Sequence, residues 1–570
     1  MEKNAQTLKP RIYTVGTSHL DTSWNWTLET TIRDYISKTL LENFERFEKY
    51  PEYVFSFEGA YRYELMEEYY PEEFKRLKQY VAAGRWNVTG SSYENGDVNV
   101  PSPESLFRNI LYGNNYFDEK FGKRSKDIFL PDCFGFGYAL PAIAHHANLL
   151  GFTTQKLTWS SAYGIPFDLG IWKGVDKNGI YASLNALSYV SVLSKVRENH
   201  KITDKLKKNI NEFGLPFTYA FHGVGDRGGA PKDSSVATVC RELRENENSA
   251  VDVLSASADQ VFRDMDTLLT KEQKERLPVW DNELVSTDHG VGGYTSRAIG
   301  KRWNRQNENL ADRTEKSAVA ALHLGAPYNK KKIDEAWKRV IAHQFHDDIP
   351  GTSLQSCYKR NWNDYMLSIS EFCEEYRANV GRVASLMDTS FAKGTPVVVN
   401  NPLQIARRDA VEVEIKTDRS TACVRVYNAA GEEVPAQVVS VRRDKLKAVF
   451  IADVPALGYA CYDIRPSVEP CPLDTGLRAE KKRLENEKYY VILDDNGDVC
   501  EIFDKELGKN ILKRPIRMGL HEYYGSVIYP AWELRYQSVC KEPIAYAADP
   551  AFEILEKGPA RVTIRTSRTA

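Results

Sequence analysis

Two histidines and two aspartates occur in short motifs whose side chains can bind a divalent metal ion. His19 and Asp21 lie in SHLDTSW, Asp132 lies in LPDCFGFG, and His346 lies in FHDDIPGTS. Taken singly, each motif has a plainer interpretation, such as a hydrogen-bonded loop histidine or a cationic histidine favoured by a helix C-terminus. Taken together, two imidazoles and two carboxylates predict a divalent-metal site, with zinc favoured and manganese, cobalt or calcium not excluded by ligand type.

A further motif, FHGVGDRGGAP, places Asp226 on a glycine-rich loop after a predicted strand. Its glycines formally match the G-x-G-x-x-G pattern of dinucleotide-binding loops. We reject a nucleotide because the next helix begins only after Asp233 and because Asp226 would face phosphate anions. A carboxyl on such a loop suits a proton donor better, although a turn-forming aspartate shows the same pattern.

These motifs follow predicted strands or a predicted helix. Aromatic residues Trp24 and Trp26 come directly after the first motif, where they could face a sugar ring or anchor a loop. Strands and helices alternate over the first ~260 residues, which favours a parallel α/β sheet or barrel with functional residues at the carboxyl ends of its strands. The predicted strands are Arg11–Thr17, Asp127–Leu130, Thr154–Trp159 and Phe217–Phe221, and two clear helices are Thr31–Lys49 and Pro71–Ala83.

The predicted secondary structure of the rest of the chain changes twice, first to long helices and then to strands. Three long stretches with helical spacing begin at Ala298 and predict a three-helix bundle, and beyond Gly394 short apolar runs separated by turn residues predict β domains. The last run continues almost to Ala570, so we expect the final β-sandwich to be truncated in this chain. The predicted domains are an α/β barrel (1–262), a helical bundle (263–388), a β domain (395–468) and the start of a further β-sandwich (475–570).

Composition excludes several classes of protein. The chain has 570 residues, with 76 Lys and Arg against 78 Asp and Glu, so no basic excess favours nucleic acid or an anionic membrane. It has no apolar run long enough to span a bilayer, and its nine cysteines include no C-x-x-C pair. No signal peptide is visible near Met1, so we expect a soluble protein that is cytoplasmic or exported with its signal already removed. Homo-oligomerisation is left open.

Several motifs in one order resemble the family 38 glycoside hydrolases, which are retaining α-mannosidases. The matching segments are TSHLDTSW, GRWNVTGSSYENGDVNVPSPESLFRN, FLPDCFGFGYALPAI, TTQKLTW, GVGDRGG, GYTSRA and QFHDDIPGTS. The resemblance is strongest from about residue 12 to residue 360 and implies an N-terminal α/β barrel, a three-helix bundle and C-terminal β domains.

The resemblance also implies roles for individual residues. It places metal ligands at His19, Asp21, Asp132 and His346, with Asp132 also acting as the nucleophile. Asp226 falls where the acid/base carboxylate is expected. Asp233 and Asp288 are two other carboxylates that could approach this position.

The resemblance implies sugar contacts at Trp24, Phe134, Asp347 and Tyr294. The role of His289 is left open, because the sequence before YTS departs from the pattern that is usual in the family. The expected activity is removal of terminal α-linked mannose from a glycan or oligosaccharide through a covalent mannosyl-aspartate, with one divalent metal, most plausibly zinc. The two rival hypotheses are a metal-dependent carbohydrate deacetylase and a catalytically silent mannoside-binding protein.

Overall fold

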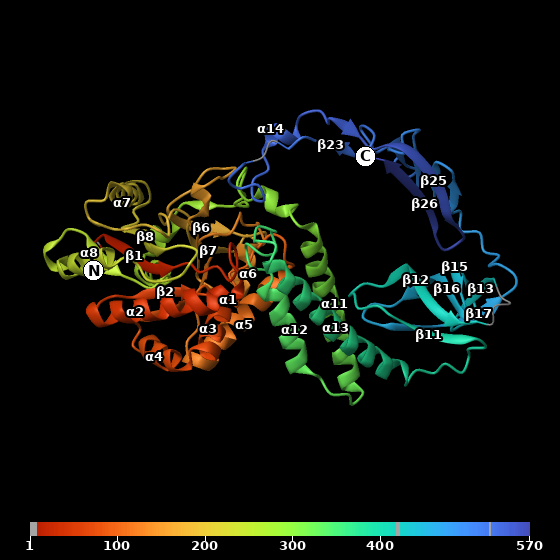
Figure 1. Cartoon of the computed structure of the whole chain (residues 1–570), viewed down its shortest axis with the longest axis horizontal. Helices are drawn as coiled ribbons and strands as arrows, with labels where there is room; N and C mark the ends of the chain where they lie inside the picture. The colour runs from red at the N-terminus through yellow and green to blue at the C-terminus, as the bar shows by residue number, and fades with distance from the viewer. Residues whose placement is uncertain (1–7, 418–421, 524–525, 570) are drawn as a thin grey trace. The chain divides into compact units, whose positions relative to one another are not determined.

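The computed structural model describes residues 8–417, 422–523 and 526–569 (Figure 1). The chain divides into two compact units. The first unit contains residues 8–311, 330–372 and 526–535, and the second contains the remaining described residues. The four domain boundaries expected from the sequence stay a prediction.

The first unit holds a five-stranded parallel sheet centred on its first strand. Strand β1 pairs with β8 along its whole length, from Arg11 beside Phe217 to Ser18 beside Val224. Its other edge pairs with β9 over the first half and with β2 near the end. The strands are β1 (Arg11–Ser18), β2 (Phe55–Glu58), β3 (Trp86–Thr89), β8 (Phe217–Val224) and β9 (Asp252–Ser255).

A second five-stranded sheet lies in the same unit, in the order β10-β6-β7-β5-β4, and only its β6–β7 pair is antiparallel. One hydrophobic core joins the two sheets, because Val15 of β1 and Phe221 of β8 pack in the same cluster as Phe129 and Leu169. The strands are β4 (Asp127–Phe129), β5 (Gly151–Thr153), β6 (Leu169–Lys173), β7 (Gly179–Ser183) and β10 (Val279–Trp280). The described strands pair as two sheets, and the closed barrel stays a prediction.

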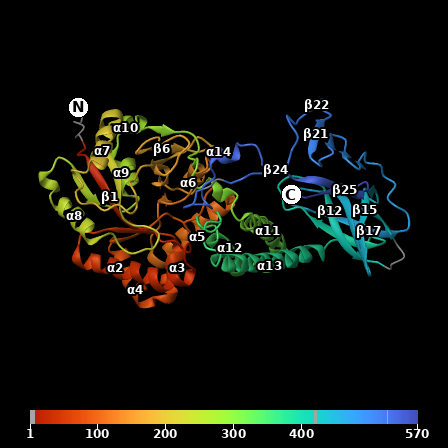
Figure 2. The same ribbon diagram turned by 45° about the horizontal axis from the view of Figure 1, so that its top comes forward.

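Helices flank these sheets. Figures 1 and 2 both show α2, α3 and α4 along one side of β1 and α7 on the other. The helices before residue 280 are α1 (Leu28–Thr30), a π-helical turn (Thr31–Ile36), α2 (Ser37–Lys49), α3 (Ala60–Tyr69), α4 (Pro71–Ala82), α5 (Pro103–Phe121), α6 (Leu140–His146), α7 (His200–Phe213), α8 (Asp233–Arg244), α9 (Gln260–Leu268) and α10 (Lys271–Glu275).

The sequence-based elements of this unit are confirmed with one exception. The expected strand Thr154–Trp159 is wrong, because the strand is Gly151–Thr153 and Lys156–Thr158 form a 3-10 turn. The polar residues after Thr153 leave the sheet edge, where Thr158 donates a side-chain hydrogen bond to the carbonyl of Gln155. This local bond supports a turn in place of further strand pairing.

The three long helices expected after residue 298 are present as α11 (Ala298–His323), α12 (Lys330–Ala342) and α13 (Cys357–Ala384). Residues of α12 such as Trp337, Val340 and Ile341 are fully buried. Their association as a three-helix bundle stays a prediction.

The second unit is built mainly from antiparallel strands. Sheets β11-β17-β13-β14 and β12-β16-β15 contribute to one core, in which Val426 and Ile464 of the first meet Ala448 and Phe450 of the second. The strands of these two sheets are β11 (Thr395–Asn400), β12 (Arg407–Lys416), β13 (Cys423–Asn428), β14 (Glu433–Val434), β15 (Ala436–Arg442), β16 (Lys445–Val454) and β17 (Tyr459–Ser467). Two sheets packed over a shared core form a β-sandwich.

Further strands follow in smaller sheets, β18-β19-β20-β21-β22, β23-β24 and β25-β26. Their bounds, with the short helix α14 (Tyr536–Val539), are β18 (Arg478–Glu480), β19 (Arg483–Glu485), β20 (Tyr489–Leu493), β21 (Val499–Asp504), β22 (Lys509–Asn510), β23 (Gly519–Leu520), β24 (Ala545–Tyr546), β25 (Ala548–Lys557) and β26 (Val562–Thr569).

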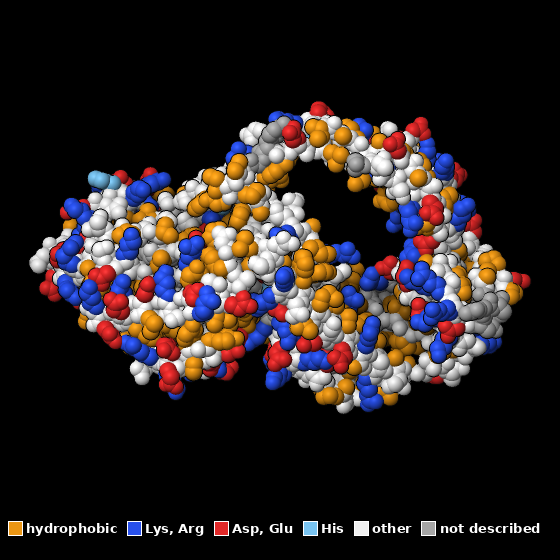
Figure 3. Space-filling model, in the orientation of Figure 1, with side chains coloured by type: hydrophobic (Ala, Val, Ile, Leu, Met, Phe, Trp, Pro, Cys, Tyr) orange, Lys and Arg blue, Asp and Glu red, His pale blue; other side chains and the backbone are white. Residues whose placement is uncertain are grey.

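Charged side chains of both signs are interspersed on the face drawn in Figure 3, without a broad basic area. Within the described residues, no helix combines the length and apolar character needed to cross a membrane. All nine cysteines are free thiols.

Candidate active site

Three strands of the first unit end at one point, and each is followed by a predicted site residue. His19 and Asp21 follow β1, Asp132 follows β4 and Asp226 follows β8. Because β1 and β8 are paired to their last residues, the loops after them lie side by side, and the Asp21 amide donates to the Asp226 carbonyl at 2.8 Å. β4 belongs to the second sheet, and the core that its Phe129 shares with β1 and β8 packs the end of β4 against theirs. Functional residues commonly gather at the carboxyl ends of such strands.

His346 reaches the same point from the turn that follows α12. Its Nε2 atom lies 3.5 Å from Asp21 Oδ1, 3.9 Å from Asp132 Oδ2 and 3.7 Å from Asp347 Oδ2. His19 Nε2 lies 3.0 Å from the same Asp21 oxygen. These five buried residues form two overlapping groups whose potential ligand atoms lie within 4.8 Å of one another, one of His19, Asp21 and His346 and one of Asp132, His346 and Asp347.

A cation fits this cluster because the buried ligand atoms lack other partners. Apart from their ion-pair contacts with one another, His19 Nε2, Asp21 Oδ1 and His346 Nε2 have no hydrogen-bond partner among the described residues, and all three atoms are inaccessible to solvent. Unsatisfied buried polar atoms are rare in proteins because they cost free energy. Burial, together with the charges of Asp21 and Asp132, raises the pKa of Asp347 to about 7, against the lowering effect of His346. A divalent cation would satisfy the orphaned atoms and relieve the crowding of carboxylates.

Asp132 is held as a carboxylate by two neighbours. Lys156 Nζ donates to its Oδ1 atom at 2.6 Å, and the Tyr189 hydroxyl donates to the same atom at 3.2 Å. Although burial alone would raise the pKa of Asp132, the charges of Lys156, His19 and His346 hold that pKa below its usual value. Asp132 is thus suited to act in its ionised form.

Asp226 has the opposite electrostatic environment. Burial, followed by the charges of Asp21 and Asp132, raises the pKa of its carboxyl above the usual value. Its backbone adopts φ of +61°, and the Tyr189 hydroxyl lies 3.0 Å from its Oδ1 atom. Gly225 permits this contact, because a Cβ atom there would lie 2.0 Å from the Tyr189 ring. A carboxyl with a raised pKa beside an ionised one is the usual arrangement of an acid and its partner.

The two alternative carboxylates lie elsewhere. Asp233 is at the start of α8 and pairs with Lys49, and Asp288 is exposed. Of these three aspartates, only Asp226 lines the cavity between the strand ends.

That cavity has a volume of about 250 Å³, near the lower end of typical ligand pockets of about 300–1,000 Å³. It combines carboxylates with an aromatic wall, which suits a small polar ligand with an apolar face. Its lining residues are Asp21, Trp24, Asp132, Phe134, Gln155, Lys156, Trp159, Ser188, Tyr189, Val190, Asp226, His289, Asp347, Tyr529 and Trp532.

Tyr294 is not among the residues that line the cavity. Its hydroxyl donates to the Phe134 carbonyl at 3.1 Å and accepts from Asn99. It therefore supports the loop that carries Phe134. His289 does line the cavity, where its ring packs against Trp159 and Tyr529.

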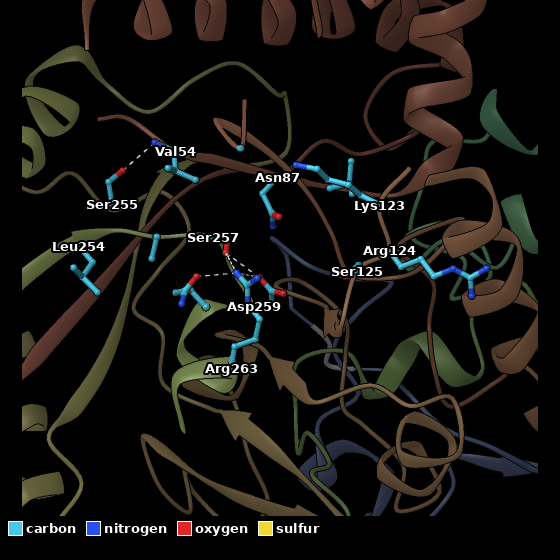
Figure 4. A pocket seen from close by; sticks show the side chains of 14 residues that line it. Val54, Asn87, Lys123, Arg124, Ser125, Leu254, Ser255, Ser257, Asp259 and Arg263 are labelled. Carbon is cyan, nitrogen blue, oxygen red and sulfur yellow. Dashed lines mark hydrogen bonds and ion pairs between the residues drawn. The ribbon is translucent and has the colours of Figure 1, made fainter. Parts of the chain in front are cut away.

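A larger cavity of about 570 Å³ opens near the amino-terminal ends of β2, β3 and β4 (Figure 4). Several of its polar groups bind one another: Ser255 Oγ accepts from the Val54 amide, and Ser257 bonds to both Asp259 and Arg263. The clustered orphaned atoms lie at the smaller cavity, which is the candidate active site.

Comparison with known proteins agrees with this geometry. Residues 9–283 match the family described as "Glycosyl hydrolases family 38 N-terminal domain", and residues 291–382 match "Alpha mannosidase middle domain". The chain belongs to glycosyl hydrolase family 38.

Curated relatives in this family are longer than this chain. It is 29% identical over 356 residues to "Alpha-mannosidase G" of Dictyostelium discoideum, covering 61% of this chain and 31% of the relative. It is 28% identical over 371 residues to "Alpha-mannosidase" of Saccharomyces cerevisiae, covering 63% and 33%. The chain therefore spans about a third of the length of these relatives.

A family 38 fold is also seen among solved structures. A crystal structure of an α-mannosidase from Enterococcus faecalis V583 superposes with a TM-score of 0.75 at 18% identity, covering 98% of this chain and 67% of that one. This superposition shows a shared fold, and the two family matches confirm the resemblance to family 38 drawn from the sequence motifs.

Sequence reasoning missed part of this family 38 site. Lys156 lies on the 3-10 turn after β5, and its place just beyond a strand end, within the segment TTQKLTW, was an available signal. Tyr189 lies in a segment without periodicity, and Tyr529 and Trp532 come from a segment over 200 residues beyond Tyr294. Trp532 is attached to the loop before Tyr294, because its carbonyl accepts from the Gly292 amide at 2.8 Å.

Proposed function

We propose that this chain is a retaining exo-α-mannosidase, which hydrolyses terminal α-linked mannose with Asp132 as nucleophile and Asp226 as acid and base. The observation that carries the proposal is the shared Tyr189 hydroxyl. It lies 3.2 Å from Asp132 Oδ1 and 3.0 Å from Asp226 Oδ1, so these oxygens are no farther apart than the two distances combined. Two carboxyls in contact with one hydroxyl lie close together, which is compatible with the ~5–5.5 Å separation of a retaining pair.

The reaction follows from the two protonation states. The Asp132 carboxylate attacks the anomeric carbon, and the bond from that carbon to the glycosidic oxygen breaks as Asp226 gives its proton to the leaving oxygen. Water then attacks the same carbon, Asp226 takes up a proton from it, and the bond to Asp132 breaks. The two steps return both carboxyls to their starting states and release mannose with its original configuration.

The cavity provides groups for one sugar unit. The Trp24 indole Nε1 is buried without a hydrogen-bond partner among the described residues and lines the cavity, so it is available to a sugar hydroxyl. Phe134, Trp159 and Trp532 offer apolar faces, and Asp347 offers a carboxyl for further hydroxyls. The curated relatives named α-mannosidases support mannose as the sugar.

We further propose His19, Asp21, Asp132 and His346 as the ligands of one divalent metal ion, and this mixed imidazole and carboxylate set favours zinc. When bound, such an ion supplies a Lewis acid that can coordinate sugar hydroxyls. The unpartnered ligand atoms support this assignment.

The activity is tested by supplying zinc-loaded protein with an aryl α-mannoside and following release of both the phenol and mannose. The anomeric configuration of the first product, read by proton NMR, should be α. A β product would contradict the retaining pair. Release of acetate from an acetylated sugar without glycosidic cleavage would favour a deacetylase, and mannose binding without turnover would favour a silent binding protein.

Metal addition is expected to stabilise the chelated protein. Binding to the folded state alone contributes about 4 kcal/mol when free metal is 1,000 times its Kd, so the melting temperature should rise by several degrees. Differential scanning fluorimetry with and without zinc measures this shift. We expect no shift for His346→Ala and a full shift for His145→Ala, since His145 is exposed. An equal shift in the His346→Ala protein would place the metal elsewhere.

Lys156→Met is expected to lower kcat/KM for the aryl mannoside about 10- to 100-fold. Its bond to Asp132 is charge-assisted, and such bonds are worth about 1.5–3 kcal/mol. Steady-state kinetics measure the loss, with Lys177→Met as the matched control because Lys177 is an exposed lysine paired with Asp281. A loss below threefold in Lys156→Met would mean that Asp132 does not depend on this ammonium.

A further inference from the structure

The two histidines of the candidate metal site use their remaining ring nitrogens in a defined way. His19 Nδ1 lies 2.9 Å from Glu58 Oε1, and His346 Nδ1 lies 2.9 Å from the Asn95 carbonyl oxygen. A carbonyl oxygen and an ionised carboxylate only accept hydrogen bonds, so each Nδ1 must carry the hydrogen. In the neutral imidazole, each Nε2 then presents its lone pair, as a metal ligand must.

Glu58 and Asn95 are themselves joined. The Asn95 side-chain amide donates to Glu58 Oε1 at 3.1 Å, so a single carboxylate oxygen receives both His19 and Asn95. The Asn95 backbone amide donates to Glu94 Oε1 at 2.7 Å, and Arg62 donates to the same oxygen. Arg62 also donates to the Leu20 carbonyl, between the two ligands that follow β1. The network thus connects the supports of both histidines with the strand end that carries His19 and Asp21.

The network is fully enclosed. Glu58, Arg62, Glu94 and Asn95 each have 0% of their surface exposed. Glu58 Oε2 is buried without a hydrogen-bond partner among the described residues. Burying an incompletely bonded carboxylate is costly unless a positive charge lies nearby. A dication held by the adjacent histidines would supply that charge.

We propose that Glu58, supported by Asn95, is a positioning residue that fixes the tautomer of His19, so that the metal site is preformed when the protein folds. This inference rests on the proposed metal site. Carboxylates or carbonyls behind ligating histidines orient the ring and raise its basicity, and their loss typically weakens metal binding about 10- to 100-fold. Glu58 lies at the end of β2, which pairs with β1, the strand directly before His19, so sheet pairing sets the distance between Glu58 and His19.

The test compares zinc affinity across variants of the full chain, by competition with a chromophoric chelator. Glu58→Gln keeps the side-chain volume but removes the charge, and we expect its zinc Kd to rise about 10- to 100-fold. Asn95→Ala removes the second donor to Glu58 and should weaken zinc binding by a smaller factor. Asp127→Asn is the matched control: Asp127 is also 0% exposed, lies on β4 and bonds to Thr89 and Ser125, so its Kd should equal that of the wild type.

A spectroscopic measurement separates positioning from loss of folding. Cobalt substituted for zinc should give a changed visible absorption band in Glu58→Gln, while Asp127→Asn keeps the wild-type band. Wild-type protein that binds neither ion would overturn the proposed metal site. If wild type and Glu58→Gln bind zinc with the same Kd, the proposed metal site stands and the positioning role of Glu58 is overturned. If Glu58→Gln does not fold, an unchanged Kd in Asn95→Ala would overturn that role in its place.

Discussion

Asp132→Ala is expected to lower kcat/KM for an aryl α-mannoside by at least about 10⁴-fold. Asp132 is the residue that would form the bond to the anomeric carbon, and it receives hydrogen bonds from both Lys156 and Tyr189. Removing a nucleophile removes the covalent path itself, so a good leaving group cannot compensate. Steady-state kinetics with a nitrophenyl mannoside measure the loss.

Because Asp132 is also a proposed metal ligand, zinc content must be measured in the same preparation. Added azide distinguishes the two roles: in a nucleophile variant that retains zinc, azide can attack from the vacated side and give a β-mannosyl azide. Asp233→Ala serves as a control, since Asp233 is a partly exposed aspartate paired with Lys49. Activity within 100-fold of wild type in zinc-loaded Asp132→Ala would assign the nucleophile to another group.

The strand ends of the site were predictable from sequence because they depend on local patterns. The apolar runs before His19, Asp132 and Asp226 form β1, β4 and β8. Parallel pairing places the ends of β1 and β8 together, whereas β4 belongs to the second sheet and packs against them through the core that contains Phe129. Helix α12, which precedes His346, was also predictable, because its apolar residues recur at helical spacing.

The remaining wall of the site depends on contacts that no local pattern encodes. Trp532 reaches the cavity because its carbonyl binds the Gly292 amide and because its ring packs against Trp24. These contacts join residues separated by hundreds of positions, and nothing in the spacing of aromatic residues near Trp532 indicates them. Tyr189 likewise depends on the space that Gly225 leaves free. The sequence therefore indicated the proposed ligands, the two proposed catalytic carboxyls and part of the cavity wall, and it missed Lys156, Tyr189, Tyr529 and Trp532.

Asp226→Ala is expected to lower kcat/KM by about 10²- to 10⁴-fold for a mannoside with a poor leaving group, and by less than about tenfold for a dinitrophenyl mannoside. A sugar or alkyl leaving oxygen needs a proton as its bond breaks, whereas a dinitrophenolate leaves without one. The raised pKa of Asp226 keeps that proton available, and activity on poor leaving groups should fall as pH rises through it. The measurement is kcat/KM against pH for both substrates, and the alkaline fall on the poor substrate should disappear in the variant.

Azide tests the second role of Asp226. Without a general base, water attacks the mannosyl-Asp132 ester slowly, so kcat for the dinitrophenyl mannoside should drop even where kcat/KM does not. Azide needs no base, and we expect it to restore kcat and to give an α-mannosyl azide, the opposite configuration from that expected with Asp132→Ala. Asp288→Ala removes an exposed carboxylate outside the cavity, so kcat and kcat/KM for both substrates should stay at their wild-type values. Equal losses on both substrates in Asp226→Ala, without rescue by azide, would remove Asp226 from the acid/base role, because a lost proton donor must discriminate between leaving groups.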